Sequence, residues 1–369
     1  MKRKLEYRWM LWCGIWAVVT LLAACDHLAK PSSSGRPYEV LVVVGDSLWQ
    51  RPAGRALFDV LDTDIPGLPQ PERSFRISQT DPQRFNQVLN IFRNIIKVDI
   101  APNQYTQTKM KFTRDVYAQP QVVLTIQSPN EKDFAAFVQK NAQSIIDFLV
   151  KMEMNRQINE LEKKHSEVVL YLADSIFSCQ FWAPVEIKSY KKGKDFFWAS
   201  SNTASGLVNI CMYSYPYEGP RTFNKQYVLA KRDSVMKANI PGTEPRMYMA
   251  TDTLCTSVKP IAVKGEYAME TRGLWKMEHD AMGGPFVSHS RVDTLNNRVV
   301  VAVGFVYAPE KMKRGLIRRL EAALYTLCLP GEQARELKAS IPEVSVVAGK
   351  EQEYTQTRKI RTMVRSWWG

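Results

Sequence analysis

Apolar runs in the first part of the chain predict strands that alternate with helices. Residues Val40 to Val44 form an unbroken β-branched run, which is typical of a strand that is buried on both faces. Apolar residues at helical spacing predict a helix from Ala53 to Leu61. Asp81-Pro82 predicts a second helix through about Phe92, because Asp caps a helix and Pro fits its first turn. Further strands are expected at Phe75 to Ser78, Ile95 to Ile100, Lys109 to Tyr117 and Val122 to Gln127.

A long helix is predicted near the middle of the chain. Ser128-Pro129-Asn130-Glu131 combines a capping box with a proline at the first helical position. An apolar stripe runs from Phe134 to Met152 and continues through Ile158 and Leu161 to about His165. We therefore expect one long helix that joins two halves of the molecule.

The second half is richer in predicted strands. These are expected at Val185 to Tyr190, Phe196 to Ala199, Leu207 to Tyr215, Arg246 to Leu254, Tyr267 to Met277, Phe286 to Asp293 and Arg298 to Tyr307. Helices are expected at Phe223 to Asn239 and Lys311 to Leu327. The whole pattern predicts an α+β fold, with mixed or antiparallel sheets, packed helices and two halves joined by the long helix.

The N-terminus has the layout of a signal peptide. A basic stretch precedes an apolar run from Trp9 to Ala24, and its basic residues are Lys2, Arg3, Lys4 and Arg8. The run is shorter than the roughly 20 apolar residues that a membrane-spanning helix needs. It ends in Leu22-Ala23-Ala24-Cys25, which resembles the lipobox of bacterial lipoproteins. That resemblance implies cleavage before Cys25 and lipidation of this residue, which would anchor the chain to a membrane.

These observations divide the chain into five parts. Residues 1–24 are the expected signal peptide, and residues 25–37 are the lipidated cysteine with a flexible tether that includes Lys30 to Gly35. Residues 38–165 are the N-terminal half, which ends in the long helix, and residues 166–345 are the strand-rich C-terminal half. Residues 346–369 are a basic tail.

The tail combines cations with tryptophans, as interfacial membrane anchors do. Its relevant residues are Arg358, Lys359, Arg361, Arg365, Trp367 and Trp368. A second contact with the membrane surface is one interpretation. The other is a frayed terminus, or one whose tryptophans pack back on the fold.

Composition supports a folded domain behind the anchor, since 45% of residues are hydrophobic, 11% are aromatic and 24% are charged. The formal net charge of +13 comes from basic residues that are spread along the chain, and we expect no nucleic-acid partner for an exported protein. Four cysteines remain behind the lipobox, namely Cys179, Cys211, Cys255 and Cys328. They contain no C-x-x-C pair, so disulfides in an oxidising compartment and buried free thiols both remain open.

One segment suggests catalysis. Gly45-Asp46-Ser47-Leu48 follows a predicted buried strand and resembles the motif of the GDSL (SGNH) esterases, which implies a nucleophilic role for Ser47. The chain departs from that family because it has no Asn-Asp pair and no Asp-x-x-His motif. Ser47 is therefore a weak catalytic candidate, and a strand followed by a polar turn is the simpler interpretation.

Three other segments are weaker candidates for a functional site. Glu162 and His165 lie one helical turn apart and could share a proton or a metal, although a solvated helix face is the favoured interpretation. The segment from Met282 to Phe286 holds two glycines and could close on a ligand or form a tight turn. Trp275 with Tyr267 could stack on a sugar or fill a core. No motif indicates a cofactor, a nucleotide or a metal.

Across its length the chain resembles an uncharacterised family of Bacteroidota lipoproteins that carry a domain of unknown function. The resemblance lies in the lipobox and in Val43 to Trp49, Val116 to Gln121, Arg272 to Trp275 and Gly283 to Phe286. It implies a cell-envelope location and no particular activity. We expect a binding or scaffolding protein on the periplasmic face of the outer membrane, with an envelope protein or a glycan as partner. The alternatives are a serine esterase that uses Ser47 and a carbohydrate-binding accessory protein.

Overall fold

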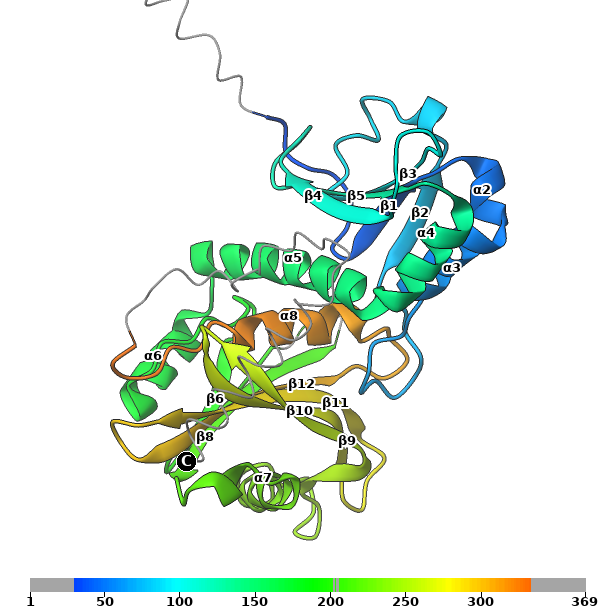
Figure 1. Ribbon diagram of the computed structural model, residues 1–369. Coiled ribbons are helices and arrows are strands. Elements are labelled where there is room, and N and C mark those ends of the chain that lie inside the picture. Colours follow the sequence, from blue (N-terminus) through cyan, green and yellow to red (C-terminus); the bar gives the residue numbers. More distant parts are fainter. Residues whose placement is uncertain (1–29, 202, 204–205, 333–369) are drawn as a thin grey trace, which may run out of the picture.

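The computed structural model describes residues 30–201, 203 and 206–332. Figure 1 shows two β-sheets; α-helices pack on one face of the first sheet and on both faces of the second. One sheet is mixed and the other is antiparallel, so the predicted α+β class is confirmed. The signal segment, Cys25 and the basic tail lie outside the described residues.

The first sheet has five strands in the order β2-β1-β3-β5-β4. Its strands are β1 (Glu39–Val43), β2 (Arg76–Thr80), β3 (Asn94–Ile100), β4 (Lys109–Arg114) and β5 (Val122–Ser128). All pairs are parallel except the antiparallel pair of β4 with β5. As its apolar run predicts, β1 is buried on both faces. Val40 and Val42 belong to the core under the helices, whereas Leu41 and Val43 contact a smaller apolar cluster on the other face.

Helices cover one face of this sheet. They are α2 (Asp46–Gln50), α3 (Pro52–Leu61) and α4 (Glu131–Lys140). The predicted helix from Asp81 to Phe92 is wrong: Asp81 accepts a hydrogen bond from the Gln83 amide, but only the short 3-10 helix η1 (Pro82–Arg84) follows. The Asn86 side chain accepts hydrogen bonds from the amides of Val88 and Leu89, which starts a separate turn.

The predicted long helix is divided. Asn130, not Ser128, caps α4 by accepting a hydrogen bond from the Asp133 amide at 2.9 Å, and Ser128 is the last residue of β5. Asn141 separates α4 from α5 (Ala142–Lys163), which is the long helix between the halves. A further helix that the pattern did not predict, α6 (Glu167–Phe177), begins after the cap residue Ser166.

The second sheet is an antiparallel array of seven strands in the order β6-β7-β8-β12-β11-β10-β9. Its strands are β6 (Ser189–Gly193), β7 (Phe196–Ser200), β8 (Leu207–Pro216), β9 (Met249–Val263), β10 (Glu266–Met277), β11 (Gly283–Asp293) and β12 (Arg298–Tyr307). Residues of α6 and α8 (Arg314–Leu324) share a core with one face. The short 3-10 helix η2 (Pro220–Phe223) and α7 (Lys225–Asn239) pack on the other face.

The two sheets are joined through α5 and α8, which lie between them in Figure 1. Met154 and Ile158 of α5 form an apolar cluster with Ala322 of α8. Glu72 from the N-terminal half accepts hydrogen bonds at 2.8 Å from the amides of Lys313 and Arg314, where α8 begins. A carboxylate at this end also stabilises the helix dipole.

Part of the predicted tether is hydrogen-bonded to the fold. The Ser33 amide donates to the Gln119 carbonyl at 3.1 Å, and the Ser34 amide donates to the Ile91 carbonyl at 2.8 Å. The extended segment therefore joins the domain from about Pro31 rather than at Tyr38. Among the described residues, no helix is both long and apolar enough to span a membrane.

Candidate binding groove and its buried charges

An open groove of about 520 Å³ lies where the two halves meet. One wall comes from the segment before β1, and Gln157 of α5 lies beside it. The other wall is the turn before α8 and the first part of that helix. The lining residues are Pro37, Tyr38, Gln157, Lys311, Met312, Arg314, Gly315, Leu316 and Arg319.

The groove is basic. Lys311, Arg314 and Arg319 line it, and none of its described lining residues is acidic. Arg319 forms an ion pair with Glu186 at 2.7 Å. Arg314 donates a hydrogen bond to the Arg73 carbonyl at 2.7 Å, which fixes its guanidinium without neutralising it. Partial burial lowers the pKa of Arg314; Glu72 opposes this shift, whereas the positive charges of Arg76 and Arg318 add to it.

Two lining residues hold buried polar atoms without a hydrogen-bond partner among the described residues. They are the Tyr38 hydroxyl and the Gln157 side-chain oxygen, and both residues are less than 10% exposed. Such a group costs roughly 1–3 kcal/mol when it stays unpaired. Tyr38 also adopts a positive φ of 60°, which is unusual for a side chain of this size. Both atoms are enclosed by the surrounding side chains and closed to solvent, so they lie beneath the groove surface.

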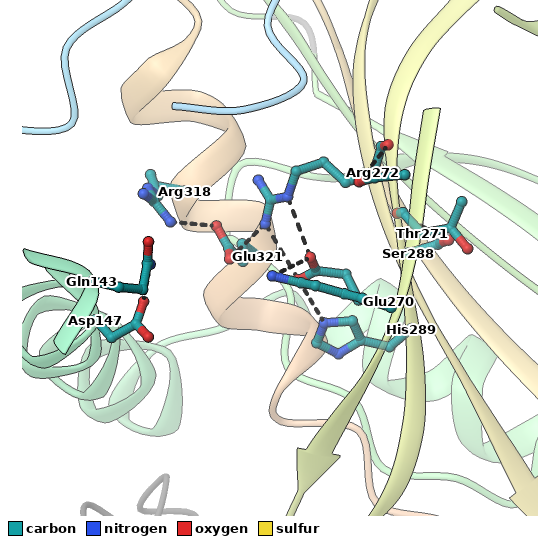
Figure 2. A network of polar contacts seen from close by, with 11 residues as sticks. Gln143, Asp147, Glu270, Thr271, Arg272, Ser288, His289, Arg318 and Glu321 are labelled. Carbon is teal, nitrogen blue, oxygen red and sulfur yellow. Dashed lines mark hydrogen bonds and ion pairs between the residues drawn. The ribbon is translucent and has the colours of Figure 1, made fainter. Parts of the chain in front are cut away.

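A buried network of charges lies behind the groove, between α8 and the second sheet (Figure 2). Arg272 of β10 contacts Glu321 of α8 at 2.6 Å and Glu270 at 3.4 Å. Glu321 also pairs with Arg318 at 2.9 Å. The Arg318 guanidinium lies 5.4 Å from the centre of the Tyr38 ring, so the network reaches the groove through this contact.

The outer end of the network is on the sheet. Lys259 contacts the Glu270 carboxylate at 3.3 Å, and the His289 imidazole lies 3.9 Å from it (Figure 2). Burial would raise the pKa of Glu270, but the neighbouring His289, Arg272 and Lys259 outweigh burial and hold it below its ordinary value. The buried Glu321 behaves likewise, because Arg272 and Arg318 lower its pKa despite burial. Both carboxylates therefore stay ionised.

A second buried network lies on the N-terminal side. Glu153 of α5 contacts Arg156 at 2.6 Å and Arg93 at 3.1 Å, and it accepts a hydrogen bond from the Asn94 amide group at 2.7 Å. Tyr38 lies between the two networks: burial raises its pKa, and it interacts electrostatically with Arg318, Glu321 and Glu153. Its hydroxyl is therefore protonated at neutral pH and can donate a hydrogen bond.

The structure places Ser47 outside the groove lining, in the exposed short helix α2. Its hydroxyl makes no hydrogen bond with any described residue, whereas the neighbouring Asp46 pairs with Arg84. Of the described histidines, His289 lies in the buried network, His165 stacks on Trp182 at 5.6 Å, and His279 follows β10. None of the three is hydrogen-bonded to Ser47, as a Ser-His pair would require.

The four cysteines are free thiols in the structure. Cys179, Cys211 and Cys328 are buried, and Cys255 is exposed on β9. Of the two alternatives that the sequence left open, the structure shows free thiols. Within the described part of the chain, no three His, Cys, Asp or Glu side chains gather as metal ligands would.

The remaining sequence candidates have structural roles. Trp275 is buried and donates a hydrogen bond to the Val306 carbonyl at 3.1 Å, so it fills the core and does not form a sugar platform with Tyr267. His165 contacts the Leu161 carbonyl and Trp182, and no contact joins it to Glu162 among the described residues. Gly284 lies where an added Cβ would meet the Val306 carbonyl oxygen at 2.1 Å, which explains the glycine by close strand packing.

Sequence reasoning missed the groove residues and the buried network. A signal was present: Glu270 and Arg272 directly follow the apolar Ala268 and Met269 in β10, and Arg318 and Glu321 lie one turn apart in α8, among apolar residues such as Ile317 and Leu320. Charged residues at core positions require partners. Their pairing joins distant parts of the chain, so spacing along the sequence could not identify it.

Comparisons with known proteins identify two regions. Residues 33–162 match the family model described as domain of unknown function (DUF8532), and residues 170–326 match the one described as domain of unknown function (DUF4837). No curated protein is significantly similar to the chain. A crystal structure from Bacteroides thetaiotaomicron VPI-5482 is 13% identical with a TM-score of 0.20, and the match covers 42% of this chain and 46% of that one. The match thus spans less than half of that protein, and the two family matches carry no activity.

Proposed function

We propose that this chain is a lipid-anchored protein of the cell envelope that binds a ligand in the groove between its two halves. The lipobox-like segment at Cys25 supports the anchor, and the expected location is the periplasmic face of the outer membrane. One observation carries the binding role: residues of both halves line the groove and place the basic Lys311, Arg314 and Arg319 beside the apolar Pro37 and Met312.

Binding accounts for the groove better than hydrolysis does. Its described lining contains no Ser, Thr, Cys, His, Asp or Glu, and of its groups that could act as nucleophile or general base, Tyr38 is buried with a raised pKa and Lys311 is the other. The residues around it are instead fixed by ion pairs and hydrogen bonds, as in a preformed ligand site. The esterase alternative would require chemistry at Ser47, on a different element of the fold.

The test is a substitution that fills the groove and leaves the ion pairs and hydrogen bonds around it unchanged. Gly315 lines the groove, and a Cβ added there would meet no atom within 4 Å, so Gly315→Leu should fold normally. The full-length protein is purified from membranes, and its co-purifying small molecules are identified by native mass spectrometry. We expect a bound molecule with the wild type and its loss with Gly315→Leu.

The matched control is Ala238→Leu, at an exposed position of α7 on the opposite face of the second sheet. This variant should retain the bound molecule. An equal complement of small molecules in all three proteins, or none in the wild type, would contradict the binding role.

The anchor is tested separately with Cys25→Ser. Because the thiol is the lipid acceptor in a lipobox, the variant should lose the lipid mass and leave the membrane fraction. A variant that kept its diacylglycerol would refute the anchor without affecting the groove.

A further inference from the structure

We propose that the ligand of this groove is an anionic amphiphile, with a phosphate or carboxylate head among Lys311, Arg314 and Arg319 and an apolar chain along Pro37, Met312 and Leu316. This inference rests on the proposed binding role and adds the chemical class of the ligand. It is carried by the combination of cations and exposed apolar side chains in one groove.

The cations define the head group. Three basic residues line the groove, and Arg76 and Arg318 add positive charge close to Arg314, while Glu72 and Glu186, which pairs with Arg319, offset part of this charge. Glu72 already accepts the first amides of α8, so the helix end itself is occupied, and an anion would bind the side chains. Guanidinium groups present paired donors that match the oxygens of phosphate and carboxylate.

The apolar residues define the rest of the ligand. Met312 is 66% exposed, one of the few large apolar side chains that the fold leaves open to solvent. It lies between Lys311 and the start of α8, and Pro37 and Leu316 line the same groove. Methionine adapts its shape to apolar ligands because it is unbranched and flexible. A fully polar anion would leave these contacts unused.

The experiment compares three probes by isothermal titration calorimetry. The full-length protein is held, without detergent, in a nanodisc of lipids that carry no net charge. Dodecyl phosphate carries both head and chain, inorganic phosphate carries the head alone, and dodecyl maltoside carries the chain with an uncharged head. All are used below their micelle-forming concentrations. We expect dodecyl phosphate to bind at least tenfold more tightly than either of the others, with affinity that falls as salt rises.

Two substitutions at one exposed position test the sign of the charge. Met312→Asp and Met312→Lys both remove the apolar side chain, but they introduce opposite charges beside the cations. Dodecyl phosphate should bind Met312→Asp about tenfold more weakly than Met312→Lys, as expected for a charge reversal near a surface site. Dodecyl maltoside should bind the two variants equally. Because the position is exposed, both variants should fold.

Each outcome decides between the proposals. Tighter binding of dodecyl maltoside than of dodecyl phosphate would overturn the anionic head, and equal binding of inorganic and dodecyl phosphate would overturn the apolar chain. Absence of dodecyl phosphate binding would overturn the ligand class altogether. In each of these cases, loss of a co-purified molecule in Gly315→Leu would still support a groove ligand of another class.

Discussion

Substitution of Glu321 tests how much the buried network contributes to the stability of the fold. Its carboxylate lies 2.6 Å from Arg272 and 2.9 Å from Arg318, and all three residues are buried. Glu321→Gln leaves two buried guanidinium groups short of a counter-charge; Arg272 retains Glu270 at 3.4 Å, whereas Arg318 loses its ion-pair partner. Breaking a buried ion pair by removing one partner costs about 3–5 kcal/mol. That is a large part of the 5–15 kcal/mol typical of a folded domain.

The loss should depend on pH. Because the folded pKa of Glu321 is below its ordinary value near 4.5, the carboxylate contributes stability above about that pH. This contribution disappears as the pH falls through the lower, folded pKa. The difference in unfolding free energy between wild type and Glu321→Gln should therefore be full at pH 7 and shrink below about pH 4.5.

Urea unfolding followed by circular dichroism measures both effects. The control is Asp59→Asn, since Asp59 and Arg55 form an exposed pair on α3 at 3.9 Å. Such a pair contributes at most about 0.5 kcal/mol. A cost for Glu321→Gln below about 1 kcal/mol, or a difference that grows on acidification, would refute the electrostatic account of the network.

Three further predictions concern other parts of the chain. Cys255 should react with a maleimide in the folded protein, while Cys179 and Cys211 react only after unfolding, since burial raises the pKa of both thiols to about 12; rapid modification of all three would contradict their burial. Gly54→Ala should lower the thermal midpoint by several degrees, because a Cβ there would lie 2.3 Å from the Leu48 carbonyl oxygen; an unchanged midpoint would count against this packing. A fluorophosphonate should leave Ser47 unmodified, and stoichiometric labelling that Ser47→Ala abolishes would favour the esterase alternative.

Those parts of the fold that depend on neighbouring residues in the sequence were predictable. The apolar run at Val40 reports burial directly, and the α+β class follows from such runs together with helical stripes. Helix limits were less predictable, because several residues compete to cap a helix. Ser128 and Asn130 both suit the start of α4, and pairing of β5 with its neighbours places Ser128 in the sheet.

The groove was not predictable because its residues are distant in sequence. Tyr38, Gln157 and Arg314 meet only after two sheets and two helices have packed. Local motifs were misleading for the same reason: the Trp275 side chain could stack on a sugar, and only its contacts with Phe305 and Val306 of β12 show that it belongs to the core. The local sequence pattern predicts which residues are buried and where turns occur. The groove, in contrast, forms only when segments that are distant in the sequence pack together.

The contact between Glu72 and the start of α8 has a consequence for the order of folding. The two bonded residues Glu72 and Lys313 are 241 positions apart, and closing a flexible loop of that length costs about 5 kcal/mol of chain entropy plus a constant. Contacts with such a large sequence separation form late, after local structure has reduced the effective loop. The groove is therefore among the last parts of the fold to form. Ligand affinity would then measure whether the chain has folded completely. Folding intermediates with both sheets formed but undocked would have native secondary structure and no binding capacity.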